Sequence, residues 1–402
     1  MTEETFDIAV VGAGAVGLSA ALAFARDGYR TALIGNLDTR RDGRTVALLN
    51  GSIRFLDALG AWPLLRSEAA PLETMRIIDD TGSLFRPPPV AFSAAEIGLD
   101  AFGWNIENVT LVEKLAELGR SFERLTMFPQ HAAGYEAGAA FASIALAEGP
   151  RVRAGLVVAA DGRNSKLRQI AGIDARTWSY PQSAITAVLA HDRDHREAST
   201  EFHTRHGPFT LVPLPGRRSS LVWVTSTEEA QRLAALDDAA LARRVERQAQ
   251  SLLGAMRIDG PRGLVPMSGL SVSRYQADRL ALVGEAAHVF PPIGAQGLNL
   301  GFRDVAALRD AVVDAGDDGC EPGADETLKR YQRGRDLDVR LRTAAVDSLN
   351  RTLLTGLIPA DFLRGAGLLA LSNIGPLRRA VMREGVLPRV GAPRLMRGDE
   401  AA

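Results

Sequence analysis

The stretch Leu280–Asp310 reads LALVGEAAHVFPPIGAQGLNLGFRDVAALRD. It opens with an apolar run that ends at Gly284, which predicts a short buried strand. Pro291 and Pro292 then disfavour a helix and favour an extended segment. A glycine-containing turn and a second apolar pattern follow, so the stretch predicts strand, extended segment, turn and helix in succession.

The expected helix of this stretch begins at a backbone without bulky side chains. Gly294 and Gly297 permit a tight turn, and from Leu298 the apolar residues recur at helical spacing. The helix is therefore predicted to begin at about Gly297. Free N–H groups and the positive end of the helix dipole attract an anion at such a start. A flat cofactor that becomes negative on reduction would suit this place.

The start of the chain predicts a second unit of strand, turn and helix. Phe6–Val11 is an apolar run, and an alanine-rich helix is expected to end at about Asp27. The sequence GAGAVG lies between them and fits the GxGxxG pattern of dinucleotide-binding sites. Its first glycine permits the turn, its second lets a pyrophosphate approach, and its third lets helix pack on strand. The predicted cofactor-binding residues are Gly12, Gly14, Ala15, Val16 and Gly17.

One position departs from the usual dinucleotide-binding pattern. An acidic residue that binds the ribose is expected at the end of the second strand, Arg30–Ile34, but Gly35 occupies that position. Either Asn36 or Asp38 binds the ribose hydroxyl groups instead, or the contact is absent and the cofactor is held more weakly. The departure argues against a strict NAD-dependent dehydrogenase.

Length and composition limit the class of protein. The 402 residues suit two closely associated domains, and 46% hydrophobic with 24% charged residues is the usual globular mixture. A net charge of −1 gives no indication of nucleic-acid binding. The single Cys320 excludes an intrachain disulfide and fits the cytoplasm. Neither a signal peptide nor a transmembrane run is expected.

Three motifs resemble those of the FAD-dependent aromatic hydroxylases, the family of para-hydroxybenzoate hydroxylase. GEAAH from Gly284, the two prolines and GAQGLN from Gly294 look like the second FAD motif of this family. DGRNSKLR from Asp161 resembles its middle motif, near the pyrophosphate and the route of the nicotinamide donor. With the glycine motif at Gly12, the three occur in the family's order and cover the whole chain.

Three further phrases resemble the ubiquinone-biosynthesis hydroxylase branch of this family. They are RTVALLNGS from Arg44, AFGWNIEN from Ala101 and GPFTLVPLP from Gly207. The resemblance implies FAD as cofactor and NAD(P)H as electron donor. It implies that O2 forms a flavin C4a-hydroperoxide, which hydroxylates the phenolic ring of a polyprenylated ubiquinone precursor.

The resemblance also implies roles for individual residues. The backbone of Gly297, Leu298 and Asn299 would bind the flavin and stabilise its anionic reduced form, and Pro292 would help place the phenol. Asn108 is either a flavin contact or the N-cap of a helix. Further cofactor contacts are implied for Arg44, Asp161, Gly284, Gly294, Gln296 and Glu285, the last a longer carboxylate than the family's usual aspartate. No metal site is expected, because the histidines between 191 and 206 lack zinc-ligand spacing.

The expected fold is α/β, with a Rossmann-like FAD-binding domain, an interleaved mixed β-sheet substrate domain and C-terminal helices. The FAD-binding domain is assigned residues 1–75, 99–175 and 271–345, the substrate domain 76–98 and 176–270, and the helical segment 346–402. One polar helix is expected from Glu228 to about Gln250. The apolar but interrupted segment 353–377 could lie on the inner membrane, dock to a partner or pack on the protein itself.

Three alternatives to this function stay open at the level of sequence. The first is a hydroxylase of a soluble aromatic acid or phenol. The second is a flavin-dependent reductase of isoprenoid double bonds. The third is a non-catalytic accessory subunit, which Gly35 and Glu285 keep in consideration. The sequence also leaves the oligomeric state open, a dimer included.

Overall fold

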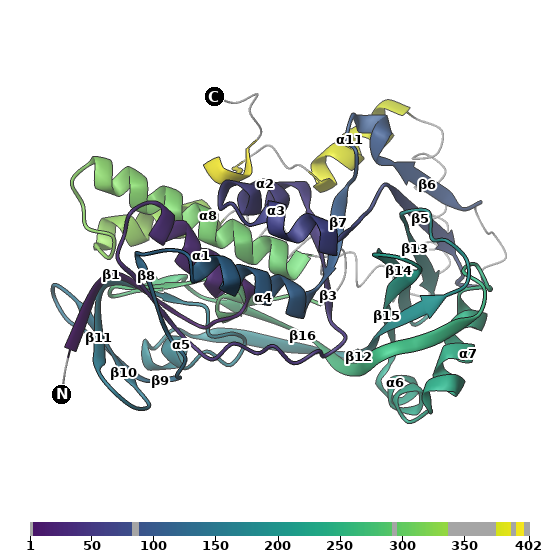
Figure 1. Ribbon diagram of the computed structural model, residues 1–402, viewed down its shortest axis with the longest axis horizontal. Coiled ribbons are helices and arrows are strands. Elements are labelled where there is room, and N and C mark those ends of the chain that lie inside the picture. Colours follow the sequence, from purple (N-terminus) through teal and green to yellow (C-terminus); the bar gives the residue numbers. More distant parts are fainter. Residues whose placement is uncertain (1–2, 83–87, 292–295, 337–374, 387–390, 398–402) are drawn as a thin grey trace.

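The computed structural model describes residues 3–82, 88–291, 296–336, 375–386 and 391–397 of the chain. These residues form an α/β fold with two large sheets and one small sheet (Figure 1). This agrees with the fold class expected from the sequence.

The first large sheet contains the parallel strands that follow the dinucleotide-binding pattern. Its order is β17-β18-β11-β1-β2-β8, and β10 and β9 extend it from β11 as an antiparallel hairpin. Its strands are β1 (Glu3–Val11), β2 (Thr31–Ile34), β8 (Leu125–Phe128), β9 (Ala132–Ala137), β10 (Ala142–Leu146), β11 (Arg151–Ala159), β17 (Gln276–Ala277) and β18 (Leu280–Leu282).

Helices pack over this sheet and over one another (Figure 1). They bury a continuous apolar core with the strands, because the second half of β1 and the helix after it are almost wholly apolar. The helical elements of this half are α1 (Ala15–Arg26), α4 (Asn108–Gly119), α5 (Lys166–Ile170), η3 (Gly284–Ala286) and α8 (Gln296–Asp317), and residues 325–336 are also helical.

The second large sheet is mixed and has the order β19-β16-β12-β15-β14-β13-β5-β6. Only β13 and β5 pair in parallel. Its strands are β5 (Thr74–Asp79), β6 (Val90–Ser93), β12 (Ala175–His191), β13 (Ala198–Thr204), β14 (Gly207–Leu214), β15 (Arg218–Ser226), β16 (Met256–Val272) and β19 (His288–Val289). The strands β12 and β16 have 17 residues each and run from one half of the molecule to the other (Figure 1).

A small sheet, β3-β7-β4, lies between the two halves (Figure 1). It is formed by β3 (Thr45–Leu49), β7 (Gly103–Glu107) and β4 (Ala70–Pro71). The short helical elements near it are α2 (Asn50–Ala58), α3 (Trp62–Leu65), η1 (Arg66–Glu68) and η2 (Ala94–Ile97).

The prediction of one continuous polar helix from Glu228 to about Gln250 is wrong. The structure has two helices there, α6 (Thr227–Ala234) and α7 (Asp238–Gln248). The Asp237 side chain accepts a hydrogen bond from the Ala240 amide and caps a new helix. The leucines of both helices pack on the second sheet, so apolar spacing alone did not reveal the break.

Two of the histidines between 191 and 206 have structural roles beside the exposed charged residues 192–194. His191 and His195 are buried, and both are bound within the protein. The Nε2 atom of His191 lies 3.0 Å from the Ser219 hydroxyl, and Nε2 of His195 lies 3.0 Å from the Leu214 carbonyl oxygen. These histidines therefore help to close one end of the second sheet.

Little of the expected C-terminal segment can be compared. Only α11 (Gly375–Val386) and η4 (Arg394–Met396) are described beyond residue 345. The membrane or partner contact expected for 353–377 lies outside the described residues, apart from the first residues of α11. No helix in the described ranges is both long and apolar enough to cross a membrane.

Candidate functional site

The glycine motif meets the middle motif at the ends of adjacent parallel strands. Gly12 directly follows β1 and has φ +116°, and a Cβ atom there would lie 2.1 Å from the Ala160 carbonyl oxygen and 2.9 Å from the Asp161 nitrogen. A Cβ atom at Gly17 would lie 1.8 Å from the Gly12 carbonyl oxygen. Both positions therefore require glycine for the packing of the protein itself.

Gly14 differs from these two glycines, because space lies in front of it. It is the N-cap of α1, with φ −78° and ψ 178°, a backbone conformation that any residue adopts. A Cβ atom at Gly14 would have no protein atom within 4 Å. The open space faces the start of a helix, where N–H groups attract a phosphate. Gly14 therefore fits close approach of a pyrophosphate.

The second FAD motif packs directly on the first through Val16. A Cβ atom at Gly284 would lie 3.2 Å from the Val16 side chain, and one at Gly301 would lie 2.7 Å from it. Val16 thus occupies the space between the strand end at Gly284 and helix α8. The structure brings together the starts of α1 and α8, which lie far apart in the sequence.

The side chains of Asp161 and Arg168 connect the middle motif to its surroundings by hydrogen bonds. Oδ2 of Asp161 accepts hydrogen bonds from the amides of Lys166 and Leu167, at 2.9 and 3.2 Å. Its buried Oδ1 has no hydrogen-bond partner among the described residues, so it can accept one from a bound hydroxyl group. Arg168 is buried and donates to the Ala286 carbonyl oxygen at 2.9 Å, which links this motif to the second FAD motif. Burial lowers the pKa of Arg168.

The missing acidic residue after β2 has a steric explanation. A Cβ atom at Gly35 would lie 2.7 Å from the Ala13 nitrogen, so a carboxylate does not fit there. Of the two substitutes, Asp38 is bound to Arg40 by two bonds of 2.9 Å, which lower its pKa to about 2. Asn36 is exposed, with its amide nitrogen 3.1 Å from Nε2 of His131. Of the two side chains, that of Asn36 is therefore less engaged in bonds within the protein.

The start of α8 is held in place by Asn299. Its Oδ1 accepts hydrogen bonds from the Leu49 amide at 2.9 Å and the Ser52 hydroxyl at 2.7 Å. Its Nδ2 donates to the Ala47 carbonyl oxygen at 2.8 Å. The amide group therefore ties the helix to β3 and α2, which leaves the backbone of this turn as the part that can face a cofactor.

Other expected residues at this helix start are more exposed. Beyond its chain neighbours and its own helix, a Cβ atom at Gly297 would have no atom of the described residues within 4 Å, so the space beside this turn is open to those residues, as at Gly14. Gln296 and Leu298 are half-buried, and Glu285 is exposed. Pro292 and Gly294 lie outside the described residues.

A buried charge cluster supports the second FAD motif, and sequence reasoning missed its centre. Asp304 on α8 accepts hydrogen bonds from the Gly284 amide at 2.8 Å, His288 Nε2 at 2.6 Å and Arg335 Nε at 2.8 Å. Burial raises the pKa of Asp304, but His288 and Arg335 outweigh this effect, so the pKa lies below its usual range. The sequence feature that could have revealed Asp304 is its position, as an aspartate, on the apolar face of an otherwise amphipathic helix.

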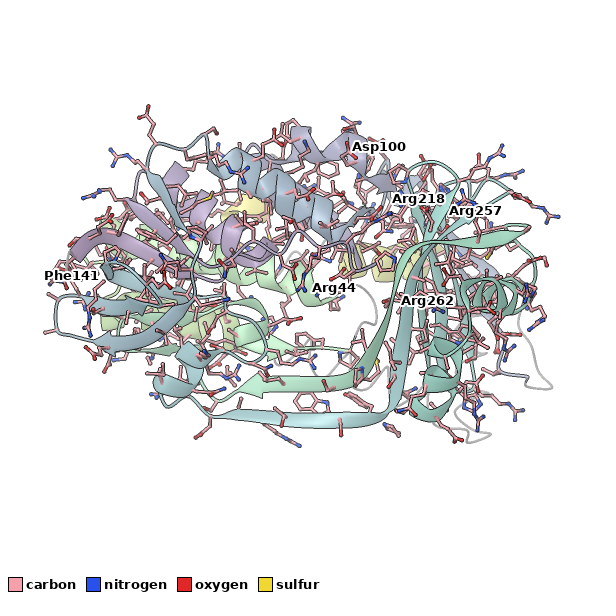
Figure 2. The ribbon with its side chains drawn as sticks, turned by 60° about the horizontal axis from the view of Figure 1, so that its bottom comes forward. Arg44, Asp100, Phe141, Arg218, Arg257 and Arg262 are labelled. Carbon is pink, nitrogen blue, oxygen red and sulfur yellow. The ribbon has the colours of Figure 1, made fainter. Side chains whose placement is uncertain are left out.

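Arg44 and Asn108 lie together at the edge of the small sheet. The Asn108 amide donates to the Arg44 carbonyl oxygen at 3.0 Å, and the Arg44 side chain donates to Asp42 at 2.5 Å. Glu107 occupies the N-cap position of α4, so the N-cap interpretation of Asn108 is wrong. In Figure 2, Arg44 lies on the side of the helices that faces β12 and β16. Its guanidinium group is exposed enough to meet a cofactor.

These features together fit FAD. Two open helix starts suit a pyrophosphate and a flavin edge, and an unsatisfied buried acceptor suits a hydroxyl group of the cofactor. Bound FAD would supply the redox chemistry, and the protein would supply binding, orientation and electrostatics. Among the described residues, no group of histidine, cysteine and acidic side chains could hold a metal ion.

Comparisons with known proteins agree with this site. The family model described as FAD binding domain matches residues 5–337. Ubiquinone hydroxylase UbiL of Rhodospirillum rubrum is 36% identical, over 98% of this chain and 94% of the relative. The 3-demethoxyubiquinol 3-hydroxylase of Escherichia coli is 30% identical, over 95% and 99%.

A solved structure shows the same fold. The crystal structure of p-nitrophenol 4-monooxygenase PnpA from Pseudomonas putida superposes with a TM-score of 0.79, at 18% identity, over 95% of this chain and 98% of that one. The family model and the hydroxylase relatives both span most of this chain. The chain therefore belongs to the FAD-dependent aromatic hydroxylases and, within them, to the ubiquinone-biosynthesis hydroxylase branch.

Proposed function

We propose that this monooxygenase hydroxylates the phenolic ring of a polyprenylated ubiquinone precursor, with NAD(P)H as electron donor and O2 as the source of oxygen. The observation that carries the substrate class is the similarity to UbiL, a ubiquinone hydroxylase, along nearly the whole chain. The similarity covers both large sheets and is not confined to the cofactor motifs, so it includes the half of the molecule that would face a substrate.

The proposed roles of the residues follow from the geometry of the site. Gly14, Ala15 and Val16 would hold the pyrophosphate at the start of α1, and Asp161 would accept a hydrogen bond from a cofactor hydroxyl. The backbone of Gly297, Leu298 and Asn299 would stabilise negative charge on the flavin. Further contacts are proposed for Gly12, Gly17, Asn36, Arg44, Asn108, Gly284, Glu285, Gly294 and Gln296, and Pro292 is proposed to help place the phenol.

The division into domains is proposed along the sheets. Residues 1–75, 99–175 and 271–345 would bind FAD, and 76–98 with 176–270 would enclose the substrate. A polyprenylated substrate resides in a membrane, so a peripheral location at the inner membrane is also proposed. The segment 353–377 is the proposed contact, either with the membrane or with a biosynthetic complex. Flotation with lipid vesicles, compared with a chain that lacks residues 346–402, tests this part.

The test of the function begins with the cofactor. The purified protein is given FAD, desalted and examined by absorbance, and a retained two-band flavin spectrum is expected. The holoenzyme then receives NADH or NADPH, a short-chain prenylated phenol and isotopically labelled O2. The expected product carries one labelled oxygen atom on its ring. Turnover only on soluble phenols would contradict the proposed substrate class, and oxygen-independent reduction would contradict hydroxylation.

A further inference from the structure

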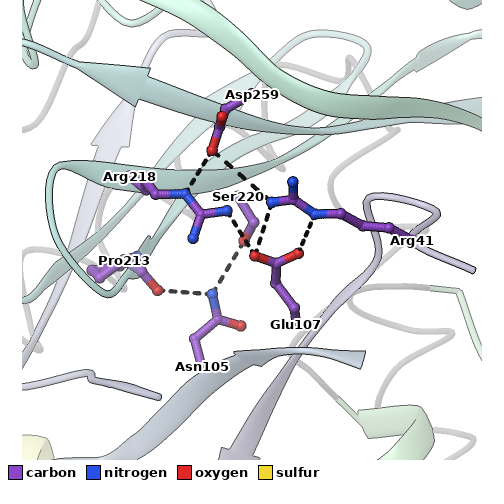
Figure 3. Close-up of polar contacts among 7 residues, drawn as sticks. All are labelled: Arg41, Asn105, Glu107, Pro213, Arg218, Ser220 and Asp259. Carbon is purple, nitrogen blue, oxygen red and sulfur yellow. Dashed lines mark hydrogen bonds and ion pairs between the residues drawn. The ribbon is translucent and has the colours of Figure 1, made fainter. Parts of the chain in front are cut away.

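A polar cluster joins four segments of the chain where the small sheet meets the second large sheet (Figure 3). We call it the inter-sheet cluster, and it consists of Arg41, Glu107, Arg218 and Asp259. Arg41 lies in the segment 35–44 between β2 and β3, which has no regular secondary structure. Glu107 ends β7, and the other two residues belong to β15 and β16.

Both carboxylate oxygens of Glu107 are used. Oε2 accepts from Arg41 Nε at 2.8 Å, and Oε1 accepts from Arg41 Nη2 at 3.1 Å and from Arg218 Nη2 at 2.7 Å. Arg218 Nε in turn donates to Asp259 at 2.7 Å. The two positive and two negative groups alternate, so the cluster is neutral. The paired bond from Arg41 gives the carboxylate one fixed orientation.

Glu107 is the most buried member of the cluster. Its side chain is 14% exposed, against 43% for Arg41. Burial raises the pKa of Glu107, but the bonds from Arg41 and Arg218 outweigh that effect, so its pKa lies below the usual range. Glu107 is therefore ionised at neutral pH, and its charge is partly shielded from salt.

The segment 35–44 rests on β16 at two further places. A Cβ atom at Gly43 would lie 2.4 Å from the Pro261 carbonyl oxygen, and one at Gly260 would lie 3.4 Å from the Arg41 guanidinium carbon. The approach at Gly43 is too close for a side chain, whereas the contact at Gly260 is an ordinary van der Waals distance and glycine is favoured there by its φ of +128°. Among the described contacts of this segment with β16, the 4.0 Å ion pair between Arg41 and Asp259 is the one that a charge change can remove without changing the backbone.

Two candidate cofactor residues depend on the position of this segment. Asn36 and Arg44 both belong to it, and the Arg44 carbonyl oxygen is bound by the amide of Asn108, the residue after Glu107. Arg41 is only three residues before Arg44, so fixing the Arg41 side chain limits where the Arg44 backbone can lie. No described hydrogen bond or ion pair of Glu107 involves a residue at the start of α1 or α8.

We propose that Glu107 is a positioning residue, which holds the segment 35–44 against the second sheet through Arg41 and Arg218 and so places Arg44 and Asn36 at the flavin site. The proposal rests on the assignment of an FAD site but not on the identity of the substrate. It predicts that loss of the charge at Glu107 loosens the segment while both large sheets remain folded.

The test compares Glu107→Gln with a matched change on the same strand. Asn105 is buried on β7, two residues before Glu107, and donates to the Pro213 carbonyl oxygen at 2.8 Å and the Ser220 hydroxyl at 3.2 Å. It joins the same two sheets without a described contact to the segment 35–44. Asn105→Ala therefore weakens the junction between the sheets and leaves the tie to Arg41 intact.

The readouts are amide hydrogen exchange of a peptide covering 35–44 and the dissociation constant of FAD from the folded apoprotein. Glu107→Gln is expected to speed exchange in this peptide and to weaken FAD binding by about tenfold, as loss of a partly buried ion pair would. Asn105→Ala is expected to change neither. Equal effects in both variants, or unchanged exchange in Glu107→Gln, would overturn the proposal.

Arg41→Met provides a second route if Glu107→Gln does not fold, because Arg41 is more exposed. It should reproduce both effects, and the effects of the two changes should be less than additive in the double variant, since both remove the bond between Arg41 and Glu107. Arg40→Met is the control within the segment, because its bond to Asp38 is exposed. Neither readout needs turnover, so a failed hydroxylation assay would remove the proposed substrate and leave this result standing.

Discussion

At the scale of single residues, the three glycines of the first motif have different physical roles. Gly12 and Gly17 allow backbone atoms of the protein to approach one another, whereas Gly14 opens onto space without protein atoms. Within this one motif, Gly12 and Gly17 are therefore needed for the packing of the protein, and Gly14 is available to a ligand. A substitution at the first two positions is expected to impair folding, and a substitution at Gly14 is expected to impair cofactor binding.

Gly14→Val is expected to fold and to fail to retain FAD. Its backbone conformation suits valine, and the added atoms enter the open space at the start of α1. Gly17→Val should instead destabilise the protein itself, because its Cβ atom would overlap the Gly12 carbonyl oxygen. Thermal unfolding of the apoproteins and titration with FAD measure the two effects. A Gly14→Val protein with full flavin occupancy would contradict the geometry described for the site.

Asp304 is the residue whose charge has the largest expected effect on stability. Asp304→Asn would replace the buried carboxylate that pairs with Arg335 by a neutral amide, at a cost of about 3–5 kcal/mol near pH 7. The folded-state pKa of Asp304 is lowered, so its contribution is complete above the unfolded value of about 3.9 and disappears as pH falls through the folded value.

Urea unfolding at several pH values measures this difference. The gap between the wild type and Asp304→Asn should stay constant from pH 7 to about 5 and narrow only below about 4. Asp318→Asn is the control, because its bond to Arg330 is at the surface and is worth at most about 1 kcal/mol. A gap that closes near pH 6 would assign the effect to another group.

At the scale of elements, the site depends on where α8 begins. Three hydrogen bonds from the Asn299 side chain fix its first turn to β3 and α2. Val16 fills the space between Gly284 and Gly301, which sets the distance between the starts of α1 and α8. The helix start is therefore positioned by tertiary contacts on both sides.

Asn299→Ala is expected to weaken both stability and FAD binding. It removes the partners of partly buried backbone groups of Ala47 and Leu49, which costs about 1–3 kcal/mol. Asn50→Ala removes comparable bonds to Ala101 and Phe102, and the Asn50 side chain has no described bond to α8. The comparison uses denaturant unfolding and FAD titration of both variants. A similar loss of FAD affinity in Asn50→Ala would show that general destabilisation is responsible.

At the scale of the whole molecule, two long strands connect the two cores. The strands β12 and β16 pair along most of their length and contribute to the core under α6 and α7, while the end of β16 packs with the core of the first sheet. The inter-sheet cluster adds a second connection through β7. Binding energy at the FAD site can therefore stabilise residues far from it.

Saturating FAD is expected to slow global amide exchange in both large sheets together. At a hundred times its dissociation constant, a ligand that binds only the folded state adds about 2.7 kcal/mol. Hydrogen exchange of peptides from β1 and β15 measures the two cores separately, and Gly14→Val is the control without FAD binding. Slower exchange confined to β1 would mean that the two halves unfold independently.

The sequence by itself determined the elements that local chemistry controls. Apolar runs before glycine motifs identified β1 and β18, and helical spacing placed the start of α8 within one residue of Gln296. The order of the three motifs identified the family, which the comparisons confirmed. Local patterns failed at Asp237, where a single capping carboxylate divides one amphipathic pattern into two helices.

Only the tertiary structure decided which residues meet. Asp304 and Arg335 are separated by 31 positions and Arg41 and Glu107 by 66, so no local pattern could pair them. Gly35 looked like a lost ribose contact, whereas its position against Ala13 shows that a side chain cannot fit there. Local propensity acts over a few residues, but burial and ion pairing depend on distances that only the folded chain creates.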